Sequence, residues 1–484
     1  MLKKAYNSLR GGLALSASLL AFLLIAPSTI NHYRSEINQF LGTTNTKVVP
    51  QDKELTQEQI DDLYPYKSIY KNTTELVTSL ANLGEEMEEE GAVLLKNKNN
   101  ALPLDSSHQK ITLLGTAAYN PHQGGEMGSG LTKNSNTDAD TVALINGFKR
   151  RGLEYSTLVQ QTYKKAGASI QKTTSPSGTE KFSNKEVSIA SLNSMNADWQ
   201  KDFVEYNTAI IVLGRASSEQ STYLPGADYV SDNDVNLHQS DALGLNDNER
   251  DIINLAVTKK NAGIFDKVIV LINSAVTMEI DEINKNPGVD SIMQIGFPGG
   301  YGFYGVADLL MGKVSPSGHL PDTYAVDNHL SPAAQNYGVY TWSNLLNIES
   351  NPKYSGKLIN NYLVEAEGIY TGYYYYETRY EDQVKNRFNA SSSKGSVAMS
   401  GWNYENEVTY PFGYGLSYSS FKQELKALNV NKEERKITAE VEVTNVGNYD
   451  AKDVVQLYVH APYLEGQVEK SAIKLIYYGK TKEL

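Results

Sequence analysis

Four short apolar runs, each closed by a turn, constrain the fold of this 484-residue chain more than any other feature. They are ITLLG (111–115), TAIIVLG (208–214), KVIVLIN (267–273) and VDSIMQIG (289–296). Each run is rich in β-branched residues and shows no polar alternation, which is typical of strands covered on both faces. The runs are separated by chain long enough for crossover helices.

Two of the intervening segments, 140–151 and 246–259, have helical patterns and predict right-handed crossovers between parallel strands. The fold class that we predict is α/β, a three-layer sandwich with a mostly parallel sheet, over residues 65–420. In such a fold the loops at the carboxyl ends of the strands face any ligand.

Composition excludes several classes of function. The net charge of −12, with no basic cluster to offset it, repels phosphate backbones, so we predict no nucleic-acid partner. Cysteine is absent, which removes disulfides and thiolate nucleophiles. The seven histidines lack the H-x-x-x-H and H-x-H spacings of metal sites, and no G-x-S-x-G elbow is present. We therefore predict no metal and no cofactor.

Residues 1–31 differ from the rest of the chain. Lys3, Lys4 and Arg10 precede an uncharged stretch, 11–30, that is rich in apolar residues. A stretch of ~20 apolar residues can cross a bilayer, and positive charge before it predicts that the remainder is exported. We expect an uncleaved single-pass transmembrane helix in the cell membrane, with the globular part extracellular.

A cleaved signal peptide is the alternative for this segment. Ala26 and Ser28 are small enough to suit a cleavage enzyme, but the apolar run is longer than a usual signal core of roughly 7–15 residues. Residues 32–64 are polar and show little periodicity, so we expect a stalk or linker.

The folded body is expected to begin with a helix. Apolar residues at helical spacing occupy 76–90, and Gly91 ends the pattern before the apolar segment 92–95. The apolar positions are Leu76, Leu80, Leu83 and Met87. We interpret the five glutamates between 85 and 90 as a solvated face, since acids clustered without regularly spaced oxygen ligands make no metal site.

Residues 421–484 have a different pattern. Apolar and polar residues alternate with period two over 421–430, 436–443 and 453–460, which indicates antiparallel strands. The segment supplies about four strands of an all-β domain.

Four motifs in order complete the sequence pattern. They are EEEGAVLLKNKNNALPL (88–104), FPGGYGFYGVADLLMGKVSPSGHLPDTY (297–324), EGIYTGYYYYETRY (367–380) and YPFGYGLSYSSF (410–421). Together they resemble the non-barrel half of glycoside hydrolase family 3, the β-glucosidase-like enzymes. This resemblance implies hydrolysis of O-glycosyl bonds, with a β-linked glucoside or oligosaccharide as substrate.

The resemblance also implies parts that we do not find in the sequence. VEVTNVGNYDAKDVVQLYV (441–459) resembles the fibronectin type III-like module of the family, but such a sandwich needs ~100 residues and about seven strands. No segment accommodates the family's catalytic barrel of ~250 residues, which carries the aspartate nucleophile. We expect the front of a permuted enzyme, shortened by truncation, by frameshift or by a genuine split into two polypeptides.

Glu219 is the candidate catalytic residue. It lies in GRASSEQSTYLPG (214–226), the loop fed by the strand TAIIVLG, where a carboxylic acid of raised pKa can protonate a glycosidic oxygen. The family places its acid/base glutamate in a Gly-Arg-x-Ser/Gly-Gly-Glu-Gly pattern, which Gly214, Arg215 and Glu219 match. Ser218 and Gln220 replace the glycines of that pattern. A solvated loop glutamate without a task is the alternative, and Asp228, Asp232 and Asp234 nearby read as turn residues.

A glycine-rich piece, GGEMGSG (124–130), follows the strand ITLLG and resembles the family's loop near the entrance to the sugar site. Its spacing matches neither a dinucleotide fingerprint nor a phosphate loop. The resemblance adds Arg215 and four residues of this piece as substrate-binding candidates: Gly124, Gly125, Gly128 and Ser129. A purely structural loop is the alternative.

Two further matches to the family favour structural roles. In LINSAVTMEIDEI (271–283) we expect Asn273 and Ser274 to cap the following helix and Glu279 to pair internally. The tyrosines of 373–376 are expected in a sheet or at the edge of the core, with sugar stacking as the alternative.

The sequence therefore predicts part of an exported β-glucosidase-like glycoside hydrolase, inactive alone, that supplies the acid/base side of a retaining site. A barrel-bearing polypeptide would be its partner. The alternative is a non-catalytic surface module that binds glycan or protein, and a third possibility is a decayed gene product.

Overall fold

The computed structural model describes residue 56 and residues 68–124, 142–168, 170–174, 180–184, 186–215, 243–335, 340–343, 361–365, 367–384, 402–462 and 467–484. The chain divides into two units, Met1–Lys71 and Asn72–Leu484. Nearly all of the first unit, including the predicted anchor and linker, lies outside the described residues. Among the described residues, no helix combines the length and the apolar character that crossing a bilayer requires.

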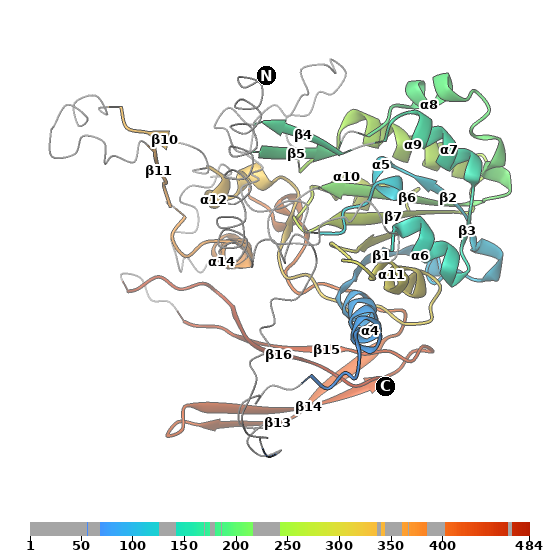
Figure 1. Cartoon of the computed structure of the whole chain (residues 1–484). Helices are drawn as coiled ribbons and strands as arrows, with labels where there is room; N and C mark the ends of the chain where they lie inside the picture. The colour runs from blue at the N-terminus through green and yellow to red at the C-terminus, as the bar shows by residue number, and fades with distance from the viewer. Residues whose placement is uncertain are drawn as a thin grey trace, which may run out of the picture. The chain divides into compact units, whose positions relative to one another are not determined.

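A six-stranded sheet forms the centre of the second unit (Figure 1). Its order is β1-β8-β7-β6-β2-β3, and all neighbours are parallel except β1, which runs antiparallel to β8. The bounds are β1 Val93–Asn97, β2 Lys110–Leu114, β3 Glu154–Tyr155, β6 Thr208–Arg215, β7 Lys267–Ser274 and β8 Ser291–Gln294. The four apolar runs are thus neighbouring strands, which confirms the α/β class with a parallel-dominated sheet.

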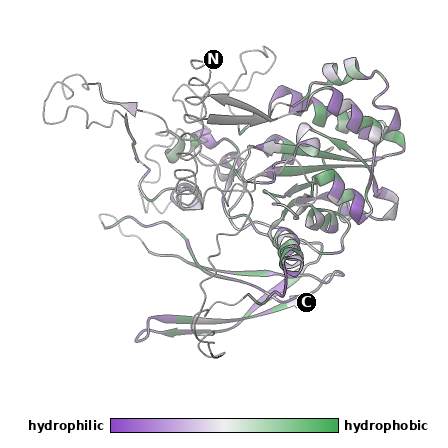
Figure 2. Ribbon diagram, in the orientation of Figure 1, coloured by the Kyte–Doolittle hydropathy of each residue, from purple (hydrophilic) through white to green (hydrophobic). Residues whose placement is uncertain are grey.

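Helices cover both faces of this sheet (Figure 1). On one face lie α7 (Thr157–Lys165), α8 (Ile189–Met195) and α9 (Asp247–Asn261), whose apolar residues pack in one core cluster. On the other face lie α5 (Thr116–Tyr119), α6 (Leu144–Arg151) and α11 (Phe303–Leu310), which pack in a second cluster. Successive residues of β6 alternate between the two clusters, and the apolar strands stand out between more polar helices (Figure 2). The three layers follow from strands that are apolar on both sides.

The remaining described elements are short. Helical ones are η1 Lys98–Asn100, η2 Ser106–His108, η3 Lys201–Val204, α10 Asp281–Lys285, η4 Asn328–Leu330, α12 Pro332–Gln335 and α15 Tyr404–Glu407. The short strands are β4 Ile170–Thr174 with β5 Glu180–Asn184, β9 Tyr324–Ala325 with β12 Val408–Tyr410, and β10 Tyr340–Thr341 with β11 Asn361–Tyr362. The β4–β5 hairpin was not expected from the sequence.

Helix α4 (Thr73–Gly91) has the predicted end at Gly91, but its faces are used differently from our expectation. Its apolar stripe is exposed, at Leu76, Leu80, Leu83 and Met87. Glu88 is buried instead, so the interpretation of all five glutamates as a solvated face is wrong. A carbon at the Cβ position of Gly305 on α11 would lie 2.8 Å from the Glu85 carbonyl oxygen, so the helices pack backbone to backbone. That approach encloses Glu88, whose burial raises its pKa well above the ordinary value.

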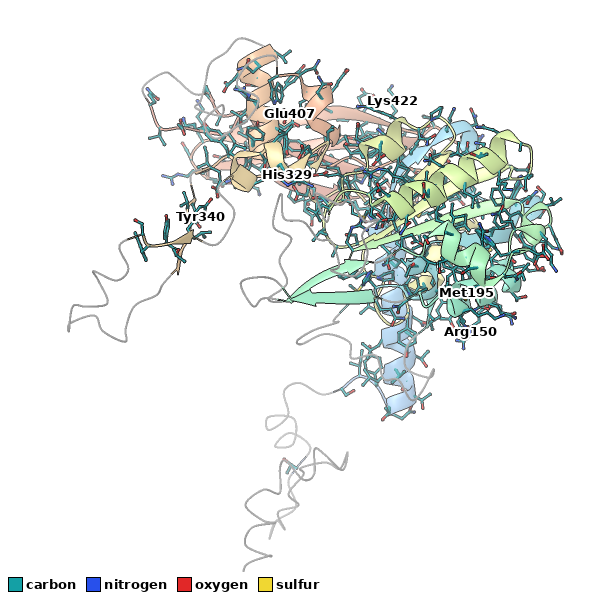
Figure 3. All side chains as sticks on the ribbon, turned by 90° about the horizontal axis from the view of Figure 1, so that it is seen from above. Arg150, Met195, His329, Tyr340, Glu407 and Lys422 are labelled. Carbon is teal, nitrogen blue, oxygen red and sulfur yellow. The ribbon has the colours of Figure 1, made fainter. Side chains whose placement is uncertain are left out.

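Helix α14 (Tyr373–Val384) contains the tyrosine run, so the expectation of a sheet there is wrong. Tyr375 and Tyr376 are buried in a small cluster with Tyr370, Ala325 and Val408. Figure 3 shows Glu407 and His329 on this side of the unit, away from Arg150 and Met195 of the helical layers. The tyrosines form the core of this lobe, in agreement with a packing role.

The C-terminal strands pair as two antiparallel hairpins: β13 (Phe421–Asn431) with β14 (Lys436–Asn445), and β15 (Val454–Val459) with β16 (Lys474–Lys480). The predicted count of four strands and the antiparallel pairing are confirmed within the described residues. One face of the first hairpin carries ion pairs of Lys426 with Glu424 and Glu442. Several apolar residues of the first hairpin remain exposed: Leu425, Leu428, Val430 and Ile437.

Candidate functional site

The carboxyl edge of the parallel sheet gathers the polar residues that the sequence marked. Gly115 follows β2, Arg215 ends β6, Asn273 and Ser274 end β7, and Gly296 follows β8. Because these strands are parallel neighbours, their carboxyl ends lie along one edge. The loops 125–141 and 216–242, which carry Gly125, Gly128, Ser129 and Glu219, lie outside the described residues. The structure therefore brings the stems of both candidate loops to this edge.

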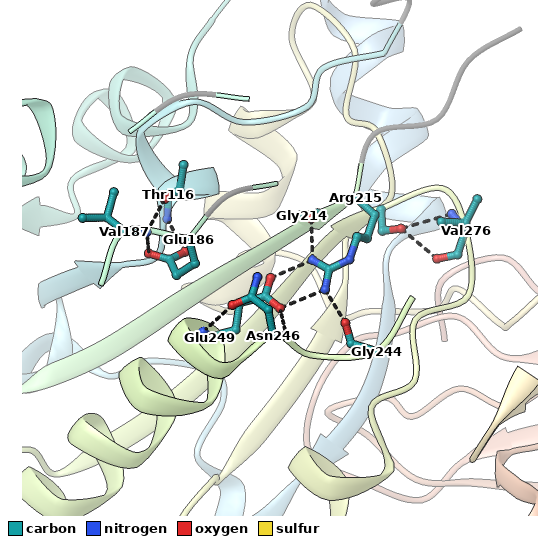
Figure 4. Close-up of polar contacts among 10 residues, drawn as sticks. Thr116, Glu186, Val187, Gly214, Arg215, Gly244, Asn246, Glu249 and Val276 are labelled. Carbon is teal, nitrogen blue, oxygen red and sulfur yellow. Dashed lines mark hydrogen bonds and ion pairs between the residues drawn. The ribbon is translucent and has the colours of Figure 1, made fainter. Parts of the chain in front are cut away.

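Arg215 makes a buried ion pair with Glu249 (Figure 4). Its Nη1 donates to Glu249 Oε1 at 2.6 Å and its Nη2 to Oε2 at 2.8 Å. The same two nitrogens donate to the carbonyl oxygens of Gly214 (2.8 Å) and Gly244 (2.6 Å). Both charged side chains are 2% exposed. Since Gly214 precedes the 216–242 loop and Gly244 follows it, Arg215 ties together the two ends of the loop that carries Glu219.

A capping box at the N-terminus of α9 fixes the position of Glu249. Asn246 is the N-cap residue, and its side chain accepts from the Glu249 backbone N–H at 2.9 Å. The Glu249 carboxylate in turn accepts from the Asn246 backbone N–H at 2.9 Å. This reciprocal capping box orients the carboxylate at the helix N-terminus, where the helix dipole also favours negative charge. Glu249 was not among the predicted residues, although N-D-N-E (246–249) before an apolar helical pattern is the signature of such a box.

Asn273 links two loops at the edge and does not cap a helix. Its side-chain oxygen accepts from the His122 backbone N–H at 2.7 Å, and its amide donates to the carbonyl oxygens of His122 (2.9 Å) and Gly296 (2.7 Å). Ser274 bonds within its own turn, with Val276. The expectation that Asn273 and Ser274 cap the following helix is therefore wrong, because α10 begins later and has no side-chain cap. The expected internal pairing of Glu279 is found: its Oε1 accepts from the Asn328 backbone N–H at 2.7 Å.

Gly124 is the one member of the glycine-rich piece that the structure describes. Its φ of 106° lies in the region that favours glycine, and a side chain there would contact Phe297. The preceding residue, Gln123, is held by two hydrogen bonds: the Gly299 backbone N–H donates to its carbonyl oxygen at 2.8 Å, and its side-chain amide donates to the Val142 carbonyl oxygen at 3.1 Å. The glycine-rich loop thus leaves the edge from a fixed point beside Phe297.

Glu186 is a buried carboxylic acid at the same edge, and the sequence analysis missed it (Figure 4). Its oxygens accept from the backbone N–H groups of Thr116 (2.7 Å) and Val187 (3.1 Å). Burial raises its pKa to about 8, while these hydrogen bonds favour the charged form, and Glu249 nearby raises the pKa further. No spacing pattern or motif marks Glu186 in the sequence, so its burial could not be predicted.

Two groups of acids in the described residues come close enough to suggest a cation. Glu279, Asp327 and His329 form one group, and Glu85, Glu89 and Asp308 form the other. Asp327 already accepts from the His329 backbone and ring, and Asp308 is paired with Arg151 (2.9 Å) and Lys313 (2.7 Å). We assign no ion to either group, because Asp327 and Asp308, one member of each group, are already engaged by internal partners.

Comparison with known proteins identifies the family of this chain. Residues 92–418 match the profile described as "Glycosyl hydrolase family 3 C-terminal domain". The chain belongs to glycoside hydrolase family 3. It is similar to a beta-glucosidase of Ruminococcus albus (26% identity over 402 residues, 82% of this chain and 34% of that protein) and to beta-glucosidase A of Butyrivibrio fibrisolvens (28% over 422 residues, 82% and 43%).

Solved structures of the family agree. The beta-glucosidase of Paenibacillus barengoltzii superposes with a TM-score of 0.60 at 26% identity, over 84% of this chain and 37% of that one. Beta-glucosidase 3B of Thermotoga neapolitana, in complex with glucose, gives 0.59 at 26%, over 85% and 47%. The chain thus spans between about a third and a half of the length of these relatives, and it is a β-glucosidase-like family 3 C-terminal domain.

Proposed function

We propose that the chain supplies the acid/base side of a retaining β-glucosidase-like site, with Glu219 as the residue that protonates the glycosidic oxygen. The observation that supports this most directly is the buried Arg215–Glu249 ion pair. It holds both ends of the 216–242 loop at the carboxyl edge of the parallel sheet, where α/β folds bind ligands. A fixed stem lets the loop present one carboxylic acid repeatedly in the same place.

The substrate that we propose is a β-linked glucoside or short oligosaccharide. The relatives named above are beta-glucosidases, and one similar structure is a complex with glucose. Gly124, Gly125, Gly128 and Ser129 are proposed as the substrate side of this edge. Because the Arg215 guanidinium is engaged with Glu249, we propose that it positions the loop that meets the sugar.

A retaining site needs a second carboxylate about 5–5.5 Å from the first. We propose that a barrel-bearing polypeptide, whether continuous with this chain or separate, provides that nucleophile opposite the 216–242 loop. The globular part is proposed to be exported and tethered by the apolar N-terminal segment, a proposal that rests on the charge pattern of residues 1–31.

Glu219→Gln in an enzyme reconstituted with a barrel-bearing partner tests the role of Glu219. We expect kcat on alkyl glucosides, which have poor leaving groups, to fall about 10²–10⁴-fold, and kcat on dinitrophenyl glucoside to fall far less. Glu205→Gln is the matched control, since Glu205 lies on the surface at the opposite end of β6 and pairs with Lys110. Equal losses on both substrates would remove Glu219 as the acid.

A non-catalytic binding module is the second candidate function. The exposed apolar residues of β13 and β14 favour it, because apolar patches of this kind mark contact surfaces. Hydrolysis of an aryl β-glucoside by the reconstituted enzyme, together with the pattern of Glu219→Gln, decides between the two functions.

A further inference from the structure

A cavity of about 330 Å³ lies between the α/β body and the β15–β16 hairpin. Its walls come from the end of α4, from 317–321, from Phe412 and Gly413, and from both strands of the hairpin. None of its lining residues is among those that end the parallel strands at the carboxyl edge. Two of its wall residues, Leu320 and Pro321, also line the hollow beside the carboxyl ends of β7 and β8, so the cavity adjoins the carboxyl edge but does not include its polar residues. Its volume lies within the range of small-molecule sites.

The walls are largely apolar and include two aromatic rings. Phe412 and Tyr478 line the cavity together with Leu320, Pro321 and Leu475. The Phe412 ring is fixed, because it stacks on Tyr373 with a centroid distance of 4.2 Å and an interplanar angle of 16°. Flat rings beside aliphatic side chains suit a ligand with an apolar face.

The charges at the cavity satisfy one another. Lys480 Nζ donates to Glu90 Oε2 (2.6 Å), to the Glu90 carbonyl oxygen (2.8 Å) and to Ser317 Oγ (2.9 Å). An ammonium group has three donors, so all of them are engaged. Lys452 pairs with the other oxygen of Glu90. An anionic ligand would therefore have to displace an existing ion pair, which disfavours phosphates and carboxylates as ligands.

Two neutral polar groups remain available at the walls. His319 Nδ1 donates to the Ser317 carbonyl oxygen at 3.2 Å, which leaves Nε2 of the neutral ring as the acceptor. Burial lowers the pKa of this histidine and so favours the neutral ring. Within the described residues, neither Nε2 of His319 nor the hydroxyl of Tyr478 has a hydrogen-bond partner. An imidazole nitrogen that accepts a hydrogen bond and a hydroxyl group, both beside aromatic faces, suit a ligand rich in hydroxyl groups.

We propose that this cavity binds a neutral pyranose, with the C–H face of the sugar on Tyr478 or Phe412 and its hydroxyls on His319 Nε2 and the Tyr478 hydroxyl. This second carbohydrate site does not rest on the proposed catalytic role. It gives the chain a contact with glucan that is independent of the acid/base loop.

Isothermal titration of the full chain with cellotriose tests the proposal, with the protein kept in a sugar-free detergent because of its apolar N-terminal stretch. Tyr478→Ala is expected to weaken binding about tenfold or more, the loss of one stacked ring and one hydrogen bond. Tyr477→Ala is the matched control. The two tyrosines are neighbours with similar exposure, 66% for Tyr478 and 68% for Tyr477. Tyr477 does not line the cavity, since successive side chains of a strand point to opposite faces.

The expected result is saturable binding that Tyr478→Ala weakens and Tyr477→Ala leaves unchanged. No saturable binding by the unaltered chain, or equal affinities of the two variants, would overturn the proposal. Hydrolysis in the reconstituted enzyme is read separately and is expected to be unaffected by either variant. If both variants retain cellotriose binding and an aryl β-glucoside competes for it, the sugar lies at the carboxyl edge. That outcome overturns this inference and leaves the proposed function intact.

Discussion

Removal of the Arg215 charge is the sharpest test of the structure. Arg215→Met keeps most of the side-chain volume but leaves the Glu249 carboxylate buried, with one hydrogen bond from the Asn246 backbone N–H. Two charge-assisted hydrogen bonds are lost at about 1.5–3 kcal/mol each, which agrees with the cost of about 3–5 kcal/mol for breaking a buried pair. We expect a loss of about 3–5 kcal/mol in the free energy of unfolding, measured by urea denaturation.

Arg250→Met is the matched control for that measurement. Arg250 belongs to the same helix as Glu249, and its Nε contacts both carboxylate oxygens of Glu282 at 2.9 and 3.1 Å, but the two side chains are 39% and 47% exposed. An exposed pair contributes about 0–1 kcal/mol, so the control is expected to lose no more than that. The double variant Arg215→Met with Glu249→Gln is expected to recover part of the loss, because it removes the unpaired charge. An Arg215→Met loss as small as that of Arg250→Met would refute the reasoning.

Two further predictions concern the same edge. The pKa of Glu186 is raised to about 8 in the folded state, whereas the unfolded state releases this proton above pH ~4.5. The folded state therefore binds more protons between pH 5 and 8. The free energy of unfolding is expected to fall as pH rises through this window, by up to about 1.4 kcal/mol per pH unit. Glu186→Gln is expected to flatten this slope in urea titrations at several pH values, and an unchanged slope contradicts the assignment. Gly115→Ala is expected to lower the melting temperature of the protein by more than Gly152→Ala. Both glycines have positive φ, so both substitutions strain the backbone. A Cβ at Gly115 would also lie 2.3 Å from the Val212 carbonyl oxygen, whereas a Cβ at Gly152 would face open space. Equal shifts would mean that the backbone relaxes at Gly115.

The parallel sheet was predictable because its strands are apolar on both faces, a pattern that few other structures tolerate. The hairpin of β4 and β5 was not, since IQKTT and EKFSN contain neither an apolar run nor a clear alternation. The helix at Tyr373–Val384 was missed for a related reason, because consecutive tyrosines favour strands intrinsically and only burial between Ala325 and Val408 stabilises them as a helix.

The site was predictable only where the residue type carries its own signal. Arg215 could be predicted from its sequence motif. Its partner Glu249 lies 34 residues away in the sequence, and the distance between the two side chains depends on how α9 packs against β6. Glu186 and Glu88 are ordinary acids in sequence, and only the packing of their surroundings buries them. The tertiary contacts that bury these acids and raise their pKa values cannot be predicted from the spacing of residues in the sequence.

Strand β1 carries a consequence for how the chain folds during synthesis. It pairs with β8, so its partner is translated 194 residues after Asn97, and Leu94 also pairs with the still later Leu416. At roughly 5–20 residues per second, the ribosome needs roughly 10–40 s to produce β8. During that time the apolar run Val93–Leu95 has neither of its native strand partners on the nascent chain. Completion of this sheet edge is therefore a late event in folding, because it waits for strands translated long after β1.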